Sequence, residues 1–269
     1  MKNLVPYLLI AFAIVVGGGS IVLLVHFPGI GPAYPSLSST ERLTLDALLC
    51  LIFFVQHSGM IRRRFKEWAG AVIPAHYYPA VYAIASGVAL GAMVIFWQRT
   101  DEVLYSLKGP AAWMLTGLSA LGAAGFFWGA WSLGSGGFDP LGLSPIRKRL
   151  RGADSPASGL AIRGPYRFVR HPLYFFVLLV IWSTPQATAD VLLSNLLFTC
   201  WIVVSTRWEE RDLVAQFGDD YRKYQTAVPM LLPFSFRKTV SWLVGRPEAE
   251  ITDKSENFRS ATAHFPDSM

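Results

Sequence analysis

Charged residues are scarce in this 269-residue chain: they make up 16% of it, whereas a soluble domain carries about 25%. Hydrophobic residues make up 52%, which leaves too few charged groups to cover a water-facing surface. The net charge of +6 comes from a few basic clusters rather than from one continuous face. Such clusters are typical of contacts with phospholipid headgroups, and they argue against a nucleic-acid partner. The composition therefore predicts an integral membrane protein.

Cysteine is also rare. The sequence contains two, Cys50 and Cys200, each within an apolar run, and it has no Cys-x-x-Cys pair. Its cysteines and histidines do not have the spacing of a zinc site. We therefore expect two buried thiols, with no disulfide bridge and no bound metal.

Apolar runs are frequent, and a spanning helix needs about 20 apolar residues. In the first run we expect the glycine triplet at 17–19 to pack closely against another helix. Residues 182–185 break the last apolar stretch, which predicts a tight C-terminal helical hairpin. The predicted spans are 4–27, 43–58, 78–97, 111–133, 173–185 and 188–206.

These spans predict an all-α integral membrane protein with about five to six transmembrane helices, including the hairpin. The glycine-rich run at 134–137 follows a span rather than a strand, so we expect no Rossmann domain. We divide the chain into helices 1–2 (1–58), helices 3–4 with basic loops (59–145), a C-terminal core (146–235) and a polar tail (236–269).

Arginine and lysine gather after the second and fourth spans, at 62–66 and 147–163. Basic loops stay in the cytoplasm, so we expect both termini and the residues around 170 on that side. After the last span, 209–228 reads as an amphipathic cytosolic helix with Gly218 as its weak point. The tail from 246 has few apolar residues and is expected to be disordered.

The stretch GPYRFVRHPLY at 164–174 places basic residues directly before an apolar helix. Pro172 suits the first helical position, which makes His171 the cap residue and leaves Arg170 just outside. The N-terminus of a helix presents free N–H groups and a partial positive charge, which suit a carboxylate or a phosphate. The alternative is an arginine that extends to the headgroups beside a helix-starting proline.

A second polar cluster, STRWEERDLV, ends the last span. The hairpin brings its two ends together, so that groups of both charge signs meet beside apolar helices, which suits a zwitterionic ligand. The alternative is a set of surface salt bridges, which contribute little. The residues expected to meet are Arg170, His171, Tyr174, Arg207 and Glu209.

The combination of RHP-x-Y, EE-x-x-L, FG-x-x-Y-x-x-Y and VP resembles the C-terminal half of the isoprenylcysteine carboxyl methyltransferase and phospholipid methyltransferase superfamily. Within it, QHSGMIRRRFKEW at 56–68, FWQ at 96–98, WSTP at 182–185 and VPMLLP at 228–233 are similar to the methanethiol S-methyltransferase family. The stretches 76–84 and 134–152 depart from that family's usual pattern.

The resemblance implies a multi-pass enzyme of the bacterial inner membrane that uses S-adenosyl-L-methionine without a Rossmann domain. It implies transfer of a methyl group to methanethiol, giving dimethyl sulfide, or to hydrogen sulfide or another small thiol. Its partners would be the thiol and the lipid bilayer, with no nucleic acid and no metal. It implies cofactor contacts at Ser158, Gly159, Leu160, Ala161, Tyr166, His171, Pro172, Leu173, Tyr174 and Glu209.

For thiol methylation, the nucleophile is the thiolate. A cationic group at Arg170 or Arg207 would lower the pKa of the thiol, in which case no base is required. His57, near the end of the second span, is the candidate base, and its alternative is a boundary histidine bonded to a backbone carbonyl. The candidate catalytic residues are therefore His57, Arg170 and Arg207.

Two other functions stay open at this point. One is methyl transfer to a lipid acceptor, either a prenylcysteine carboxylate or a phospholipid amine. The other is a non-catalytic membrane protein associated with denitrification, which would not bind S-adenosyl-L-methionine.

Overall fold

The structure is a computed structural model that describes residues 4–25, 36–134, 138–152, 160 and 162–233. Ser158, Gly159, Ala161 and the tail from 246 lie outside the described residues. The elements are α1 Val5–Phe12, the π-helix η1 Ala13–Gly18, α2 Gly19–Val25, α3 Ser39–Ile61, α4 Arg63–Ala69, α5 Tyr78–Phe96, β1 Val103–Ser106, α6 Pro110–Ser132, α7 Ser144–Arg151, the 3-10 helix η2 Gly164–Arg167, α8 Pro172–Trp182, β2 Gln186–Thr188, α9 Ala189–Phe217 and α10 Asp219–Ala227.

Five helical stretches in the described part of the chain are long and apolar enough to cross a membrane. They are Val5–Leu24, Ser39–Ile61, Tyr78–Phe96, Pro110–Ser132 and Ala189–Phe217, and the apolar α8 is shorter. The strands of the described residues form one antiparallel pair, β1–β2, which is not a Rossmann sheet. The predicted fold class is therefore confirmed, and the chain is a multi-pass membrane protein.

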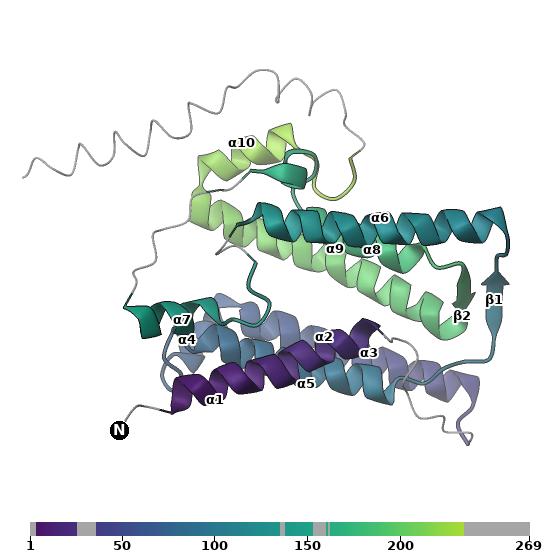
Figure 1. Ribbon diagram of the computed structural model, residues 1–269, viewed down its shortest axis with the longest axis horizontal. Helices are drawn as coiled ribbons and strands as arrows, with labels where there is room; N and C mark the ends of the chain where they lie inside the picture. Colours follow the sequence, from purple (N-terminus) through teal and green to yellow (C-terminus); the bar gives the residue numbers. More distant parts are fainter. Residues whose placement is uncertain (1–3, 26–35, 135–137, 153–159, 161, 234–269) are drawn as a thin grey trace, which may run out of the picture.

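The helices form two layers (Figure 1). One layer contains α1 to α5, and the other contains α6, α8 and α9, with α3 and α9 in contact between them. The basic helices α4 and α7 lie at the same end of the molecule as α10, and the β1–β2 pair lies at the opposite end (Figure 1). Clustering of the basic helices at one end agrees with the positive-inside rule. The cytoplasmic orientation of that end stays a prediction.

Helix α3 begins earlier than the predicted span 43–58 because a capping box starts it. The Glu41 amide donates to the Ser38 hydroxyl, and the Ser38 amide donates to the Glu41 carboxylate at 2.8 Å. This reciprocal pair satisfies N–H groups that the helix itself leaves free. The helix then continues to Ile61, so that His57 lies one turn inside its end.

Close packing was predicted for the glycine triplet at 17–19, and it is confirmed for Gly17, which is buried against α5. A Cβ added to Gly87 of α5 would lie 2.8 Å from the Cα of Gly17, so the two backbones touch. Gly18 and Gly19 have no neighbour that a Cβ would meet. One glycine of the three therefore carries the contact.

Helix α8 lies on a glycine face of α6. A Cβ at Gly125 would lie 2.2 Å from the Phe176 ring, and one at Gly129 would lie 2.9 Å from Leu173. Small residues let membrane helices approach each other closely. This contact determines where the N-terminus of α8, and with it His171, lies.

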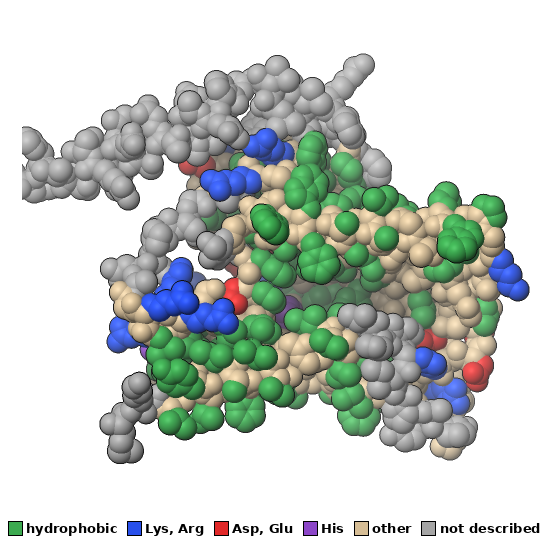
Figure 2. Space-filling view, viewed as in Figure 1, with side chains coloured by type: hydrophobic (Ala, Val, Ile, Leu, Met, Phe, Trp, Pro, Cys, Tyr) green, Lys and Arg blue, Asp and Glu red, His purple; other side chains and the backbone are tan. Residues whose placement is uncertain are grey.

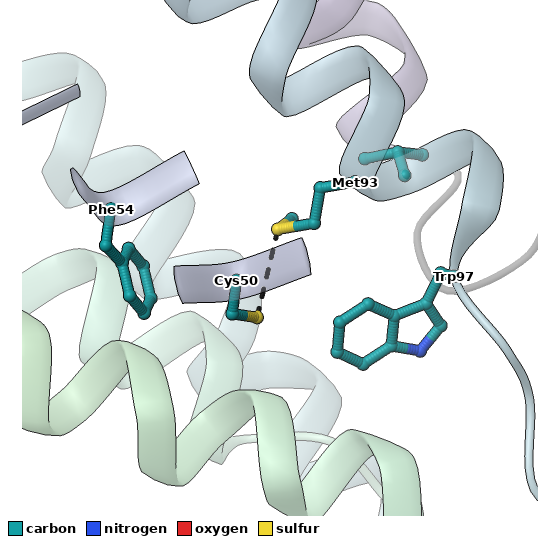
Figure 3. Packing of buried hydrophobic residues seen from close by; sticks show 5 residues of the cluster. Cys50, Phe54, Met93 and Trp97 are labelled. Carbon is teal, nitrogen blue, oxygen red and sulfur yellow. Dashed lines mark hydrogen bonds between the residues drawn. The ribbon is translucent and has the colours of Figure 1, made fainter. Parts of the chain in front are cut away.

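A buried cluster joins α3 to α5, and Figure 3 shows Cys50 beside Met93, with Phe54 and Trp97 around them. The Cys50 sulfur lies 3.9 Å from the Met93 sulfur. Cys200 was predicted to be buried, and this prediction is wrong because its side chain is exposed. Apolar residues of a membrane helix face lipid as readily as protein, so an apolar run does not reveal burial.

The hairpin between α8 and α9 is present, and polar contacts hold its far end. Asn195 donates to the Ile181 carbonyl at 2.8 Å. Asp190 accepts hydrogen bonds from Trp97 at 3.1 Å and from the Thr100 hydroxyl at 2.7 Å, which connects the two layers. Helix α9 runs unbroken to Phe217, beyond the predicted span 188–206, and a positive φ of 57° at Gly218 separates it from α10. The predicted weak point is therefore where the helix ends.

Candidate functional site

The residues before α8 are fixed by the segment that follows α10. The Arg170 amide donates to the Pro229 carbonyl at 2.9 Å, and the His171 amide donates to the Met230 carbonyl at 3.1 Å. The RHP and VP motifs, distant in the sequence, are therefore paired in space. This pairing directs the first turn of α8 toward α9 and α10.

The side chain of Arg170 also forms an ion pair. The Arg170 Nε donates to Glu210 Oε1 at 2.6 Å, and the two side chains are 9% and 12% exposed. Gln225 Nε2 donates to Glu210 Oε2 at 3.0 Å. Arg170 also donates to the carbonyls of Gln225 and Val228. These contacts join the loop before α8 to α9 and to the end of α10, so Arg170 and Glu210 act as a clamp between elements.

His171, Tyr174 and Glu209 meet beside this clamp, as expected from the sequence. The His171 ring is 5% exposed, with Nε2 3.3 Å from Glu210 and Nδ1 3.8 Å from Glu209. The Tyr174 ring stacks on it at 5.9 Å between centroids, and Glu209 lies near its hydroxyl. The Glu209 side chain is 46% exposed, so it is available to a ligand at the membrane surface.

The 3-10 helix η2 carries Tyr166. The Tyr224 hydroxyl donates to the Tyr166 carbonyl, which fixes η2 against α10. Burial, with a smaller effect from Glu209, raises the pKa of Tyr166 above its usual range, so its hydroxyl stays protonated. Leu160 packs against the cluster formed by Tyr221, Tyr224 and Val228, close to this turn.

The first turn of α8 completes this group of residues. Pro172 is fully buried, and Leu173 packs on Gly129 of α6. Its cap residue, His171, makes no side-chain hydrogen bond to the helix N-terminus. The N–H groups of that turn therefore have no side-chain cap and can receive an anionic group.

His57 lies on α3 among side chains of α5. The Tyr82 hydroxyl is 3.0 Å from its ring nitrogens, and the Ser86 hydroxyl is 3.2 Å from its Nδ1. Sequence reasoning missed Tyr82 and Ser86. With Tyr78 they follow a four-residue spacing on an otherwise apolar helix, which puts them on one face and could have identified them.

The two proposed cationic residues differ in their surroundings. The Arg170 guanidinium is nearly buried and paired with Glu210, whereas Arg207 is exposed on α9. A further arginine links the layers: Arg62 lies 4.5 Å over the Trp208 ring and 3.6 Å from Asp212. Through it, the end of α3 near His57 is held against the part of α9 that carries Glu209.

Known proteins resemble this chain over the whole of the region just described. The family model described as "NnrU protein" matches residues 47–232. Methanethiol S-methyltransferase of Pseudomonas deceptionensis is 37% identical, over 74% of this chain and 76% of that protein. The protein of the same name in Mycobacterium tuberculosis is 34% identical, over 74% and 81%.

A more distant relative is nurim of Rattus norvegicus, 24% identical over 65% of this chain and 70% of its own length. No solved structure matches the chain. The matched residues 47–232 include the His57 cluster, the Arg170–Glu210 clamp and the His171–Glu209 group. By this match, and by the methanethiol S-methyltransferases that align with it, the chain belongs to the NnrU protein family.

Proposed function

We propose that this protein transfers a methyl group from S-adenosyl-L-methionine to methanethiol, giving dimethyl sulfide. The observation that carries the proposal is the alignment of about three quarters of the chain with proteins named methanethiol S-methyltransferase. The active site would lie on the cytoplasmic side of the bacterial inner membrane, because α10, which packs against it, lies at the same end of the molecule as the basic helices α4 and α7.

The chemical groups around His171 fit S-adenosyl-L-methionine. The uncapped first turn of α8 and His171 suit the methionine carboxylate. The half-exposed Glu209 suits the amino group or the ribose hydroxyls, and the Tyr166 ring suits the adenine. Leu160 would line the same cofactor region. When bound, the cofactor supplies a methyl group on a positively charged sulfur.

The residues of the chain would act mainly by holding groups in position. The clamp of Arg170 and Glu210 fixes the loop before α8, so His171 and Tyr174 keep their places relative to Glu209. Orientation of two reactants at contact distance is a large part of the rate enhancement in such a displacement. The exposed Arg207 would add positive charge at the membrane surface, two residues from Glu209, while Arg170 contributes through the clamp.

A lipid acceptor is a second candidate because an apolar groove lies between α3 and α9. It is lined by Ala47, Cys50, Leu51, Phe54, Leu197, Cys200, Trp201 and Val204, and its volume is about 170 Å³. Pockets for drug-sized ligands have about 300–1,000 Å³, so this groove would hold only part of a lipid chain. The small volume argues against a lipid acceptor in this groove.

Purified protein in detergent, given S-adenosyl-L-methionine and methanethiol, tests the proposal through the dimethyl sulfide in the headspace. We expect product from the parent protein, and neither product nor calorimetric cofactor binding from the His171→Ala variant. The Tyr105→Phe variant is the control, since Tyr105 lies on β1 at the other end. Cofactor binding without dimethyl sulfide would move the search to hydrogen sulfide and lipid acceptors. Absence of binding in the parent protein would contradict the enzyme assignment.

A further inference from the structure

A second polar cluster, on the other helix layer, has a hydrogen-bonding position left open. The Gln56 amide nitrogen donates to the Ser86 hydroxyl at 3.4 Å, and Ser86 lies 3.2 Å from the His57 ring. The Gln56 carbonyl oxygen is buried without a hydrogen-bond donor among the described residues. A buried acceptor without a donor is costly, so it indicates a ligand that supplies one.

The end of α3 connects this cluster to the cofactor side of the site. Ser58, next to His57, accepts a hydrogen bond from Trp201 of α9 at 3.0 Å, and Arg62, one turn further along α3, lies over the ring of Trp208, the residue before Glu209. Figure 2 shows the molecule hollowed between its two layers, with a histidine side chain visible there. The His57 cluster and the His171–Glu209 group therefore lie near the same end of the contact between α3 and α9.

We propose that Gln56, His57, Tyr82 and Ser86 form the binding site of the acceptor thiol, with the Tyr82 hydroxyl next to its sulfur. This inference rests on the proposed function, to which it adds the acceptor side. The thiol is small and weakly polar. On binding, its S–H group is a weak donor to the Gln56 oxygen, and rotation about the carbon–sulfur bond then turns the same hydrogen toward the Tyr82 oxygen.

The proton of the thiol leaves through the same residues. It passes to the Tyr82 oxygen while the Tyr82 hydroxyl proton passes to the neutral His57 ring, 3.0 Å away, leaving a thiolate and an imidazolium. The thiolate electron pair forms the new sulfur–carbon bond as the methyl–sulfur bond of the cofactor breaks, and that bond's electron pair remains on the cofactor sulfur. His57 then gives the proton to water, so atoms and charge balance.

The titratable groups near Tyr82 come from three helices. They are His57 on α3, Tyr78 on its own helix α5 and Tyr174 on α8, which brings the charge of Glu209 close. Tyr78 donates to the Met60 carbonyl, away from the His57 ring, so it is a matched control on the same helix.

The test is the pH profile of dimethyl sulfide formation by Tyr82→Phe, which keeps the ring that packs against His57 and removes the hydroxyl. At pH 7 we expect a loss of about 100-fold in kcat, the scale of general-base catalysis. The deficit should shrink about tenfold per pH unit as thiolate forms in solution. Cofactor affinity should stay unchanged, and Tyr78→Phe should keep the parent profile while it loses some thermal stability.

Each outcome decides the matter. A Tyr82→Phe profile parallel to that of the parent, or the same profile change in Tyr78→Phe, would overturn the acceptor site and leave the proposed function standing. A parent protein that binds S-adenosyl-L-methionine but forms no dimethyl sulfide would overturn the proposed function, and the acceptor site with it.

Discussion

We expect the neighbouring residues Glu209 and Glu210 of α9 to have different roles, one in cofactor binding and the other in stability. Substituting each by glutamine separates the two roles. Glu210→Gln removes the charge that faces Arg170 at 2.6 Å, where both side chains are nearly buried. Breaking a buried ion pair by removing one partner costs about 3–5 kcal/mol. Taking the lower value, 3 kcal/mol, and about 2–4 °C for each kcal/mol, the melting temperature falls by about 6–12 °C.

Glu209→Gln should behave in the opposite way. Its side chain is 46% exposed and 3.8 Å from His171, so its contribution to stability is that of a surface pair, about 0–1 kcal/mol. Its expected loss is in cofactor binding, where a hydrogen bond to a charged group is worth about 1.5–3 kcal/mol, or roughly 10- to 150-fold in affinity.

The two cysteines supply the stability assay. Cys50 is fully buried and Cys200 is exposed, so in a Cys200→Ser background a thiol-reactive dye reports unfolding through Cys50 alone. Cofactor affinity is measured by calorimetry on the same preparations. Equal melting temperatures for the two variants, or a loss of affinity confined to Glu210→Gln at a temperature where it is folded, would refute this division of tasks.

Two further substitutions test how the helices are held. Gly87→Val forces a side chain to within about 2.8 Å of the Gly17 Cα, and this overpacking should cost about 1–3 kcal/mol in the same thermal assay. An unchanged melting temperature would contradict the η1–α5 contact. Arg62→Ala removes the contact with the Trp208 ring at 4.5 Å and the ion pair with Asp212 at 3.6 Å, which should lower the free energy of unfolding by about 1 kcal/mol. Salt screens the ion pair, so melting curves should show a smaller difference between parent and variant at high ionic strength than at low, and an equal difference at both would contradict the role of the charge.

Much of the fold follows from the sequence because the membrane demands long apolar helices. The spans, the hairpin and the meeting of His171, Tyr174 and Glu209 could all be predicted from run lengths and from two motifs. Strands β1 and β2 could not, since each is three or four residues long and pairs across two spans.

The division between Glu209 and Glu210 also lay beyond the sequence. Consecutive residues on a helix point about 100° apart, and only the packing of α10 decides which carboxylate reaches Arg170. The contact between His57 and Tyr82 depends in the same way on how α3 and α5 pack. Exposure of Cys200 was mispredicted because lipid-facing and protein-facing residues of a membrane helix are equally apolar.

The most direct test of the account follows the methyl group itself. Purified protein is given methanethiol and S-adenosyl-L-methionine whose methyl group carries deuterium, and the headspace is analysed by mass spectrometry. The account predicts dimethyl sulfide in which one of the two methyl groups is fully deuterated, formed only when both reactants are present. Unlabelled dimethyl sulfide, or label that appears in lipid rather than in the volatile product, would contradict it.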